Sequence, residues 1–243
     1  MSILEVNSVK KIYTTRFGGN QVQALSNVSF SVEEGEYVAI MGESGSGKTT
    51  LLNILAALDK PTNGEVVLDG KSINNIKEKE ISAFRRDNLG FVFQDFNLLD
   101  TLTAYENIAL ALQIQNFKAK AIEQQIKVVA RKLDIEDILN KYPYEMSGGQ
   151  KQRVASARAI VTNPKLVLAD EPTGALDSKS SKMLLERLQR LNQDYQTTIL
   201  MVTHDAFSAS YASKVIFIKD GKVFNQFNRG EATRKQFFDK IID

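Results

Sequence analysis

One eight-residue segment limits what this chain can fold into more than any other part of its sequence. It reads Gly42-Glu43-Ser44-Gly45-Ser46-Gly47-Lys48-Thr49, the pattern G-x-x-x-x-G-K-T, and it lies between the apolar residues 37–41 and residues 50–55. This order predicts a strand, a phosphate-binding loop and a helix. The glycines let backbone N–H groups turn toward phosphate oxygens, and the helix N-terminus adds a partial positive charge. The alternative, a glycine turn that only joins two elements, does not explain the motifs below.

The side chains of this loop have separate expected roles. Lys48 is placed to bridge the β- and γ-phosphates of a nucleotide, and the Thr49 hydroxyl to ligate Mg²⁺. We therefore predict that the ligand is a nucleoside triphosphate, ATP with Mg²⁺. The remaining residues expected to contact it here are Gly42, Ser44, Gly45, Ser46, Gly47 and Thr50.

Composition excludes several other kinds of site. The 243 residues include 31 basic and 29 acidic side chains, so no overall charge favours nucleic acid, and no nucleic-acid partner is expected. The absence of cysteine excludes disulfides, thiolate metal sites and cysteine nucleophiles. The N-terminus lacks the pattern of a secretion signal, and no apolar run approaches the length of a membrane span. A role at a membrane is therefore expected to require a partner.

The periodicity of apolar residues changes twice along the chain and predicts an α/β fold. Short β-type runs dominate residues 3–68, and helical spacing dominates from residue 103 to about 161. From residue 165 onward, short apolar strands alternate with helices. This alternation predicts a parallel sheet covered on both faces, with the middle portion as a helical insertion.

Two adjacent carboxylates, Asp170 and Glu171, end the apolar run 166–169. Ligands of parallel sheets bind at the C-terminal ends of the strands, so both acids are expected in the site. Asp170 is placed to hold Mg²⁺, directly or through water, and Glu171 to polarise the water that attacks the γ-phosphate. The alternative is a solvated acidic turn before Pro172.

Gln94 and His204 each follow another predicted strand. A glutamine at position 94 can contact the metal and the attacking water. His204 is the single histidine of the chain, and an isolated histidine is most often only a satisfied polar residue. Its position at the end of a strand parallel to the Asp170 strand favours a catalytic role instead: a donor there can bind a γ-phosphate oxygen and hold Glu171 and the water in line.

A second anion site is predicted far downstream, in the segment Met146-Ser147-Gly148-Gly149-Gln150. Ser147 stands at the N-cap position of a predicted helix, and the glycines leave the first backbone N–H groups accessible. Because the segment belongs to the helical portion, it is not expected to reach the phosphate loop of its own chain. It is expected to complete the site of a second copy.

These motifs together resemble the nucleotide-binding subunit of ATP-binding-cassette (ABC) transporters. The resemblance covers essentially the whole chain and follows the order of the family: the phosphate loop, Gln94, the signature at residues 146–150, Asp170-Glu171, Ala175-Leu176-Asp177 and His204. The one mild departure is Met146, where leucine is commoner, and the two side chains are similar in volume.

The resemblance implies a P-loop NTPase with the ABC ATPase fold, in which a mixed RecA-like core carries an antiparallel β subdomain and a helical subdomain. It implies a single domain, 1–243, with residues 1–94 and 162–243 forming the core with its β subdomain and 95–161 the helical subdomain.

Two subunits would sandwich two ATP molecules, each between one phosphate loop and the signature of the other copy. By the same resemblance Asp177 crosses the dimer interface. The resemblance also implies an aromatic residue upstream of the first strands that stacks on adenine, and Tyr13 matches it. The alternative is that Tyr13 is an ordinary strand aromatic.

The resemblance also implies a membrane partner, an integral permease whose cytoplasmic helix docks near residues 94–100. The subunit would then lie in the cytoplasm, peripheral at the inner face of the cell membrane. Segments 61–64, 85–94 and 172–178 resemble the group of macrolide-exporter and lipoprotein-release ATPases.

The C-terminal tail resembles more closely the bacitracin-type ATPases that give resistance to antimicrobial peptides. Its alternative explanation is an amphipathic helix that docks Phe237, Phe238 and Ile241 on the core.

Two other classes of protein remain open at this point. A soluble ABC ATPase acting on ribosomes or DNA would share the site, although such proteins usually carry two cassettes or long coiled coils. A small-molecule kinase would need an acceptor site and would leave residues 146–150 unexplained.

Overall fold

The computed structural model describes residues 2–14 and 19–243, which form two sheets and a group of helices. The four-stranded antiparallel sheet has the order β2 (Gln21–Glu33), β1 (Ser2–Thr14), β4 (Asn63–Leu68), β5 (Lys71–Ser72). The six-stranded sheet has the order β10 (Lys222–Asn228), β9 (Lys214–Lys219), β3 (Tyr37–Met41), β8 (Ile199–Val202), β7 (Leu166–Asp170), β6 (Leu89–Phe93). Its strands β9 to β6 are parallel, and β10 is antiparallel to β9.

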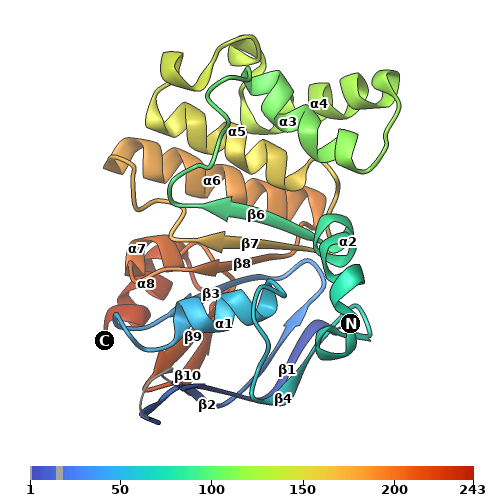
Figure 1. The fold of residues 1–243 in the computed structure, drawn as a ribbon. Helices are drawn as coiled ribbons and strands as arrows, with labels where there is room; N and C mark the ends of the chain where they lie inside the picture. Colours follow the sequence, from blue (N-terminus) through green and yellow to red (C-terminus); the bar gives the residue numbers. More distant parts are fainter. Residues whose placement is uncertain (1, 15–18) are drawn as a thin grey trace.

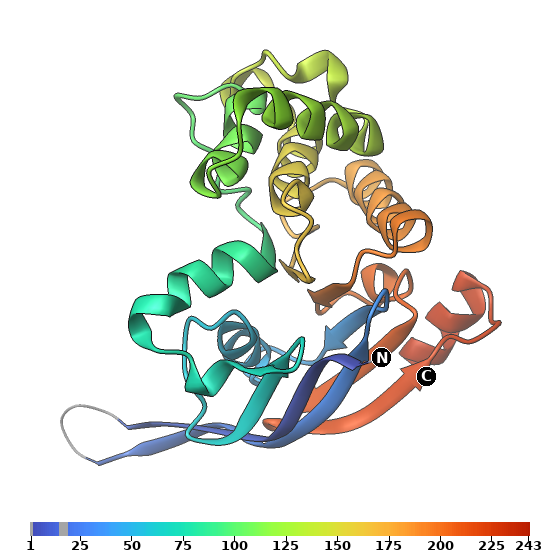
Figure 2. The ribbon, with the colours of Figure 1, turned by 90° about the vertical axis from the view of Figure 1, so that its right-hand side faces the viewer.

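The helices fall between the strands and after them. They are α1 (Lys48–Leu55), α2 (Glu78–Asn88), α3 (Ala104–Ile114), α4 (Ala119–Leu133), α5 (Gly148–Ile160), α6 (Ser178–Tyr195), α7 (Ala206–Ala209) and α8 (Arg234–Ile242). Three short 3₁₀ turns cover Ile73–Asn75, Glu136–Ile138 and Pro143–Glu145. Figures 1 and 2 show α3, α4 and α5 grouped at one end of the molecule and the antiparallel sheet at the other.

The six-stranded sheet is covered on both faces, as its apolar strands predict. Alternate residues of β3 enter two different hydrophobic clusters: Tyr37 and Ala39 join the cluster that contains the apolar residues of α3 to α8, while Val38 and Ile40 join that of α1 and the antiparallel sheet. Every residue of β3 is therefore buried, and the strand carries no charged side chain. This double burial explains why the parallel strands appear in the sequence as continuous apolar runs.

Most elements lie where the sequence places them, with three differences. Helix α2 was not predicted, because Phe84 is its one buried residue and it therefore has almost no apolar stripe. Tyr13 lies within β1 rather than ahead of the first strands. In α8, Phe237 and Ile241 are buried, whereas Phe238 is only partly buried, so two of the three expected apolar contacts form.

In the part of the chain that the structure describes, no helix combines the length and the apolar character needed to cross a membrane.

Candidate active site

The phosphate loop joins β3 to α1 and has the conformation that only glycine allows. Gly47, the N-cap of α1, has φ +102°, and a Cβ there would lie 2.6 Å from the carbonyl oxygen of Ala24. A Cβ at Gly42 would overlap the carbonyl oxygen of Ile218. The loop therefore closes against β2 and β9, and the first N–H groups of α1 remain directed at its mouth.

Lys48 holds its charge at this mouth. Its Nζ donates hydrogen bonds to the carbonyl oxygens of Gly42 and Glu43, both at 2.7 Å, and the residue is 8% exposed. Both acceptors are uncharged, so no carboxylate neutralises the ammonium through these bonds. A buried ammonium whose hydrogen bonds go to uncharged oxygens favours an anionic ligand close to Nζ.

Nine of the residues predicted from the sequence line one cavity of about 590 Å³. From four different elements it collects the phosphate loop, the ends of β7 and β8 and the start of β2. The lining residues are Val22, Gln23, Ala24, Ser44, Gly45, Gly47, Lys48, Thr49, Thr50, Asp170, Glu171, Val202 and His204. The strand-end placement of both acids and the histidine, expected from the sequence, is thus present.

Glu171 and His204 meet across the ends of β7 and β8. Nδ1 of His204 lies 2.9 Å from Oε1 of Glu171, and since a carboxylate only accepts, Nδ1 is the donor. The Glu171 backbone has φ +45°, in the left-handed region, while its N–H donates to the carbonyl oxygen of Val202 at 2.9 Å. A non-glycine residue in this region costs on the order of 1–3 kcal/mol and is typical of functional sites.

Asp170 lies beside both Glu171 and Lys48. Its pKa is raised, first by burial and then by the charge of Glu171, while Lys48 opposes the shift. One of these two neighbouring carboxylates is half-buried, so a divalent cation between them would offset their repulsion. Carboxylate oxygens are also ligands that Mg²⁺ prefers. The residues present therefore fit Mg²⁺ next to Thr49.

The other predicted residues lie outside this cavity: Gly42 and Ser46 of the loop, Asp177, the signature residues 147–150, Gln94 and Tyr13. Gln94 lies beside the turn that follows Glu171, where a Cβ on Gly174 would come 2.8 Å from its Cδ. The Tyr13 hydroxyl donates to Asp59 at 2.9 Å, and the Lys11 ammonium lies 4.9 Å from its ring centroid. Tyr13 is 42% exposed as a residue, which leaves surface for an aromatic ligand to stack on.

The signature residues form the N-terminus of α5. Ser147 accepts a hydrogen bond from the Gln150 N–H at 3.3 Å, and Gln150 Oε1 accepts from the Ser147 N–H at 2.9 Å. This capping box confirms the N-cap expected from the sequence. Gly149 packs closely against Ser180, since a Cβ on Gly149 would lie 2.9 Å from the Ser180 Oγ. A Cβ on Gly148 would only reach van der Waals contact with the Leu176 side chain.

Asp177 caps the neighbouring helix. Its carboxylate accepts from the N–H groups of Lys179 and Ser180 at 2.9 and 3.0 Å and from the Ser180 hydroxyl at 2.6 Å. These bonds, the one from the Ser180 hydroxyl first, hold the Asp177 pKa below its usual value. The N-termini of α5 and α6 therefore lie side by side through Ser180.

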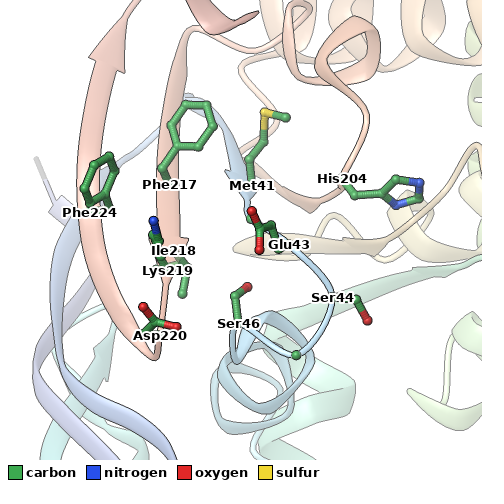
Figure 3. A pocket seen from close by; sticks show the side chains of 12 residues that line it. Met41, Glu43, Ser44, Ser46, His204, Phe217, Ile218, Lys219, Asp220 and Phe224 are labelled. Atoms are coloured by element: carbon green, nitrogen blue, oxygen red, sulfur yellow. The ribbon is translucent and has the colours of Figure 1, made fainter.

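A second cavity of about 560 Å³ borders the other side of the phosphate loop, between the loop and strands β9 and β10 (Figure 3). Met41, Phe217 and Phe224 give it a more apolar wall. Neither Asp170 nor Glu171 lines it. The cavity that contains both carboxylates is therefore the better candidate for phosphate and metal.

Two polar residues of α5 that the sequence does not point to contact the loops around the site. Gln152 Nε2 donates to the carbonyl oxygens of Phe93 and Pro172, and the Arg158 guanidinium donates to those of Phe96 and Asn97. The sequence signal for them is weak, because a fully buried glutamine within a helix can be identified only when the packing of the helix is known.

The fold and the site together define a P-loop ATPase. The model of the ABC transporter family matches residues 25–174, and the chain belongs to this family as an ATP-binding protein that hydrolyses ATP. The ABC ATPase fold predicted from the motifs is confirmed.

Three known proteins are similar over nearly the whole chain. The bacitracin export ATP-binding protein BceA of Halalkalibacterium halodurans is 50% identical over 242 residues, 100% of this chain and 95% of that protein. The dimeric MJ0796 cassette of Methanocaldococcus jannaschii, bound to ADP and Pi, has a TM-score of 0.82 at 41% identity and covers 93% of this chain and 98% of that one. cbiO1 of Clostridium perfringens, part of the cbiONQ transporter complex, has a TM-score of 0.86 at 28% identity, covering 99% and 94%. The chain is the ATP-hydrolysing subunit of an ABC transporter.

Proposed function

We propose that this ATPase subunit powers a transporter that protects a cell against bacitracin-like antimicrobial peptides. The observation that carries the proposal is the 50% identity to a bacitracin export ATP-binding protein over the full chain. The C-terminal helix α8, which lies beyond the part matched by the family model, belongs to this shared length.

In the proposed site, ATP binds along the phosphate loop. The loop N–H groups and Lys48 bind the β- and γ-phosphates, and Thr49, Asp170 and Gln94 are the residues that would hold Mg²⁺. When bound, Mg²⁺ neutralises charge on the phosphate oxygens. The burial of Lys48 and the raised pKa of Asp170 both support this assignment.

Glu171 is the proposed base and His204 the residue that orients it. The 2.9 Å contact holds one carboxylate oxygen, which leaves the other for the attacking water. As the γ-phosphoryl group leaves, negative charge develops that Lys48 would stabilise, and His204 would add a donor by turning its Nδ1–H from Glu171 to the phosphate.

The second half of each site is proposed to come from another copy of the chain. The N-terminus of α5, with Ser147, Gly148, Gly149 and Gln150, offers backbone donors and a helix dipole to the γ-phosphate of the partner's ATP. Asp177, on the adjacent N-terminus of α6, would approach the same interface. Tyr13 would stack on adenine. The dimeric MJ0796 cassette supports this homodimer.

An integral membrane permease is the proposed second partner. A cavity of about 460 Å³ lies between α2, α3, α5 and the edge strand β6, and its wall includes the stacked rings of Phe91 and Phe93. Ile114, which is 59% exposed, and the guanidinium of Arg158 also line it. An apolar cavity with a basic rim suits an amphipathic cytoplasmic helix that carries an acidic residue. Docking there would hold the subunit at the inner face of the cell membrane.

Co-expression in a peptide-sensitive bacterium tests the proposal. A membrane protein that co-purifies with the tagged chain is identified and expressed with the wild type or with Glu171→Gln. We expect bacitracin resistance to rise only with the wild type. Equal susceptibility in both strains would contradict a role in peptide resistance and would favour a lipoprotein-release or macrolide-type exporter.

A further inference from the structure

One side chain of α5 connects the two loops that carry the proposed catalytic residues. The Gln152 amide donates from Nε2 to the carbonyl oxygen of Phe93 at 3.0 Å and to that of Pro172 at 2.7 Å. Phe93 directly precedes Gln94, and Pro172 directly follows Glu171. One planar amide group thus donates to two carbonyl oxygens, one next to Gln94 and one next to Glu171.

From this geometry we infer that Gln152 is a positioning residue for ATP hydrolysis. It sets how Gln94 and Glu171 lie relative to each other. The turn after Glu171 is closed by a hydrogen bond from the Gly174 N–H to the Glu171 carbonyl oxygen at 2.9 Å, and Gln94 packs over Gly174. Moving the Pro172 carbonyl would therefore move the whole turn, including the Glu171 carboxylate.

The burial of Gln152 argues against a purely stabilising role. The residue is fully buried, and in the described part of the chain its Oε1 has no hydrogen-bond partner. A buried acceptor without a partner lowers stability, so an apolar side chain of similar length would suit the packing better. What an apolar side chain lacks is the pair of N–H donors that hold the two carbonyls.

The position of Gln152 in α5 connects it to dimer closure. Ser147 caps the N-terminus of the same helix, five residues before Gln152. Near the C-terminal end of α5, Arg158 donates to the loop that follows Gln94. A shift of α5 would therefore reach Gln94 and Glu171 through Gln152. This step rests on the proposed function, in which Ser147 meets the partner's ATP.

The experiment compares Gln152→Met, which keeps the length but removes both donors, with Ser156→Ala as a matched control. Ser156 is equally buried on α5, and its Oγ donates to the Gln152 carbonyl oxygen at 2.8 Å within the helix, away from both loops. We expect kcat of Gln152→Met to fall roughly 10–100-fold with KM for Mg-ATP unchanged, because misplacement of catalytic groups by about an ångström has this effect. Ser156→Ala should keep the wild-type kcat.

A second variant and a binding measurement separate the possible outcomes. Gln152→Asn keeps the amide but is too short to reach both carbonyls, so it should lower kcat as well if Gln152→Met does not fold. In a Glu171→Gln background, Gln152→Met should still form the Mg-ATP dimer. Wild-type kcat in both Gln152 variants, or a rise in KM equal to the fall in kcat, would overturn the inference. Failure of Glu171→Gln alone to form a dimer would count instead against the proposed two-chain site.

Discussion

Oε1 of Glu171 lies 2.9 Å from Nδ1 of His204, at the ends of two adjacent parallel strands. Glu171 reaches this position with a left-handed backbone, and its carboxylate lines the same cavity as Lys48. The contact joins the proposed base to the residue proposed to donate to the γ-phosphate. Substitution of either side chain is therefore expected to lower the rate of hydrolysis and to leave nucleotide binding largely intact.

Glu171→Gln should keep ATP binding, lose most turnover and accumulate an ATP-bound dimer. Glutamine keeps the size of the side chain and its hydrogen-bonding oxygen but cannot take a proton from water, and loss of a general base costs about 10²–10⁴-fold in rate. Size-exclusion chromatography with light scattering, with and without Mg-ATP, measures the dimer. Turnover close to that of the wild type would assign the base to another residue.

His204→Ala is the companion variant. It removes the partner of Glu171 but leaves the carboxylate, so hydrolysis should fall while the Lys48 contacts to the phosphates remain. We expect KM for ATP to change much less than kcat. A large loss of nucleotide affinity, measured by fluorescence titration, would show that His204 contributes to ground-state binding instead.

Asp170→Asn should raise thermal stability without nucleotide and abolish the effect of Mg²⁺ on ATP binding. The Asp170 pKa is raised in the folded state, mainly by burial, so the folded protein holds this proton more tightly than the unfolded chain. That contribution to stability is lost as the pH rises through the folded pKa, and at neutral pH the ionised group is a cost. Because Asp170 is only half-buried, solvent limits the gain, and we expect Tm to rise by about 1–3 °C.

The pH dependence of Tm distinguishes an effect of the Asp170 charge from a change in stability that does not depend on ionisation. The difference in Tm between Asp170→Asn and the wild type should grow as the pH increases from 4 to 7, since only the wild type ionises. Asp220→Asn, in the exposed turn between β9 and β10, is a suitable control. A constant difference at all pH values would show that the Asp170 charge does not affect stability.

Most of the parallel sheet was predictable from sequence because its strands are buried on both faces. Residues 37–41, 89–93, 166–170 and 199–202 are apolar throughout or nearly so, and local composition is enough to identify them. The N-cap at Ser147 was equally local, because the capping box depends only on residues three apart.

What the sequence did not reveal depends on tertiary contacts. Helix α2 buries only Phe84, so its amphipathic pattern is too weak to see. The bonds of Gln152 and Arg158 join α5 to carbonyl oxygens up to 62 residues away in the chain, and backbone acceptors carry no sequence signal. The sequence predicts that His204 holds Glu171, but not that Nδ1 and Oε1 are the atoms in contact.

Ser147→Arg should block dimer closure while leaving ATP binding by the single chain intact. The long cationic side chain would occupy the space between α5 and the partner's phosphate loop. It also removes the N-cap, which costs about 1 kcal/mol. Ser147→Ala is the matched control because it loses the cap without adding bulk. In the Glu171→Gln background, only the arginine variant should remain monomeric with Mg-ATP. Loss of nucleotide binding by the monomer would contradict a site shared by two chains.

Arg158→Lys should weaken coupling to the permease more than it weakens ATP hydrolysis. The guanidinium donates to the Asn97 carbonyl oxygen at 2.5 Å and to that of Phe96 at 3.1 Å. Phe96 and Asn97 have φ +61° and +50°, and this left-handed backbone costs about 1–2 kcal/mol for each residue. The loop therefore needs the forked donor to keep its shape, and a lysine ammonium does not reproduce that geometry.

The measurement is ATPase activity of the subunit alone and of its complex with the co-purified permease. Since Arg158 also lines the cavity proposed for the permease helix, we expect Arg158→Lys to lose most of the stimulation by the permease. Basal kcat should stay within about threefold, a change of less than about 0.7 kcal/mol in the barrier. The control is Arg187→Lys, because Arg187 pairs with Asp134 at 3.1 Å between α6 and the end of α4 and does not line the cavity. Full stimulation in Arg158→Lys would mean that the loop after Gln94 keeps its shape without the guanidinium, and that the coupling runs through other contacts of α5.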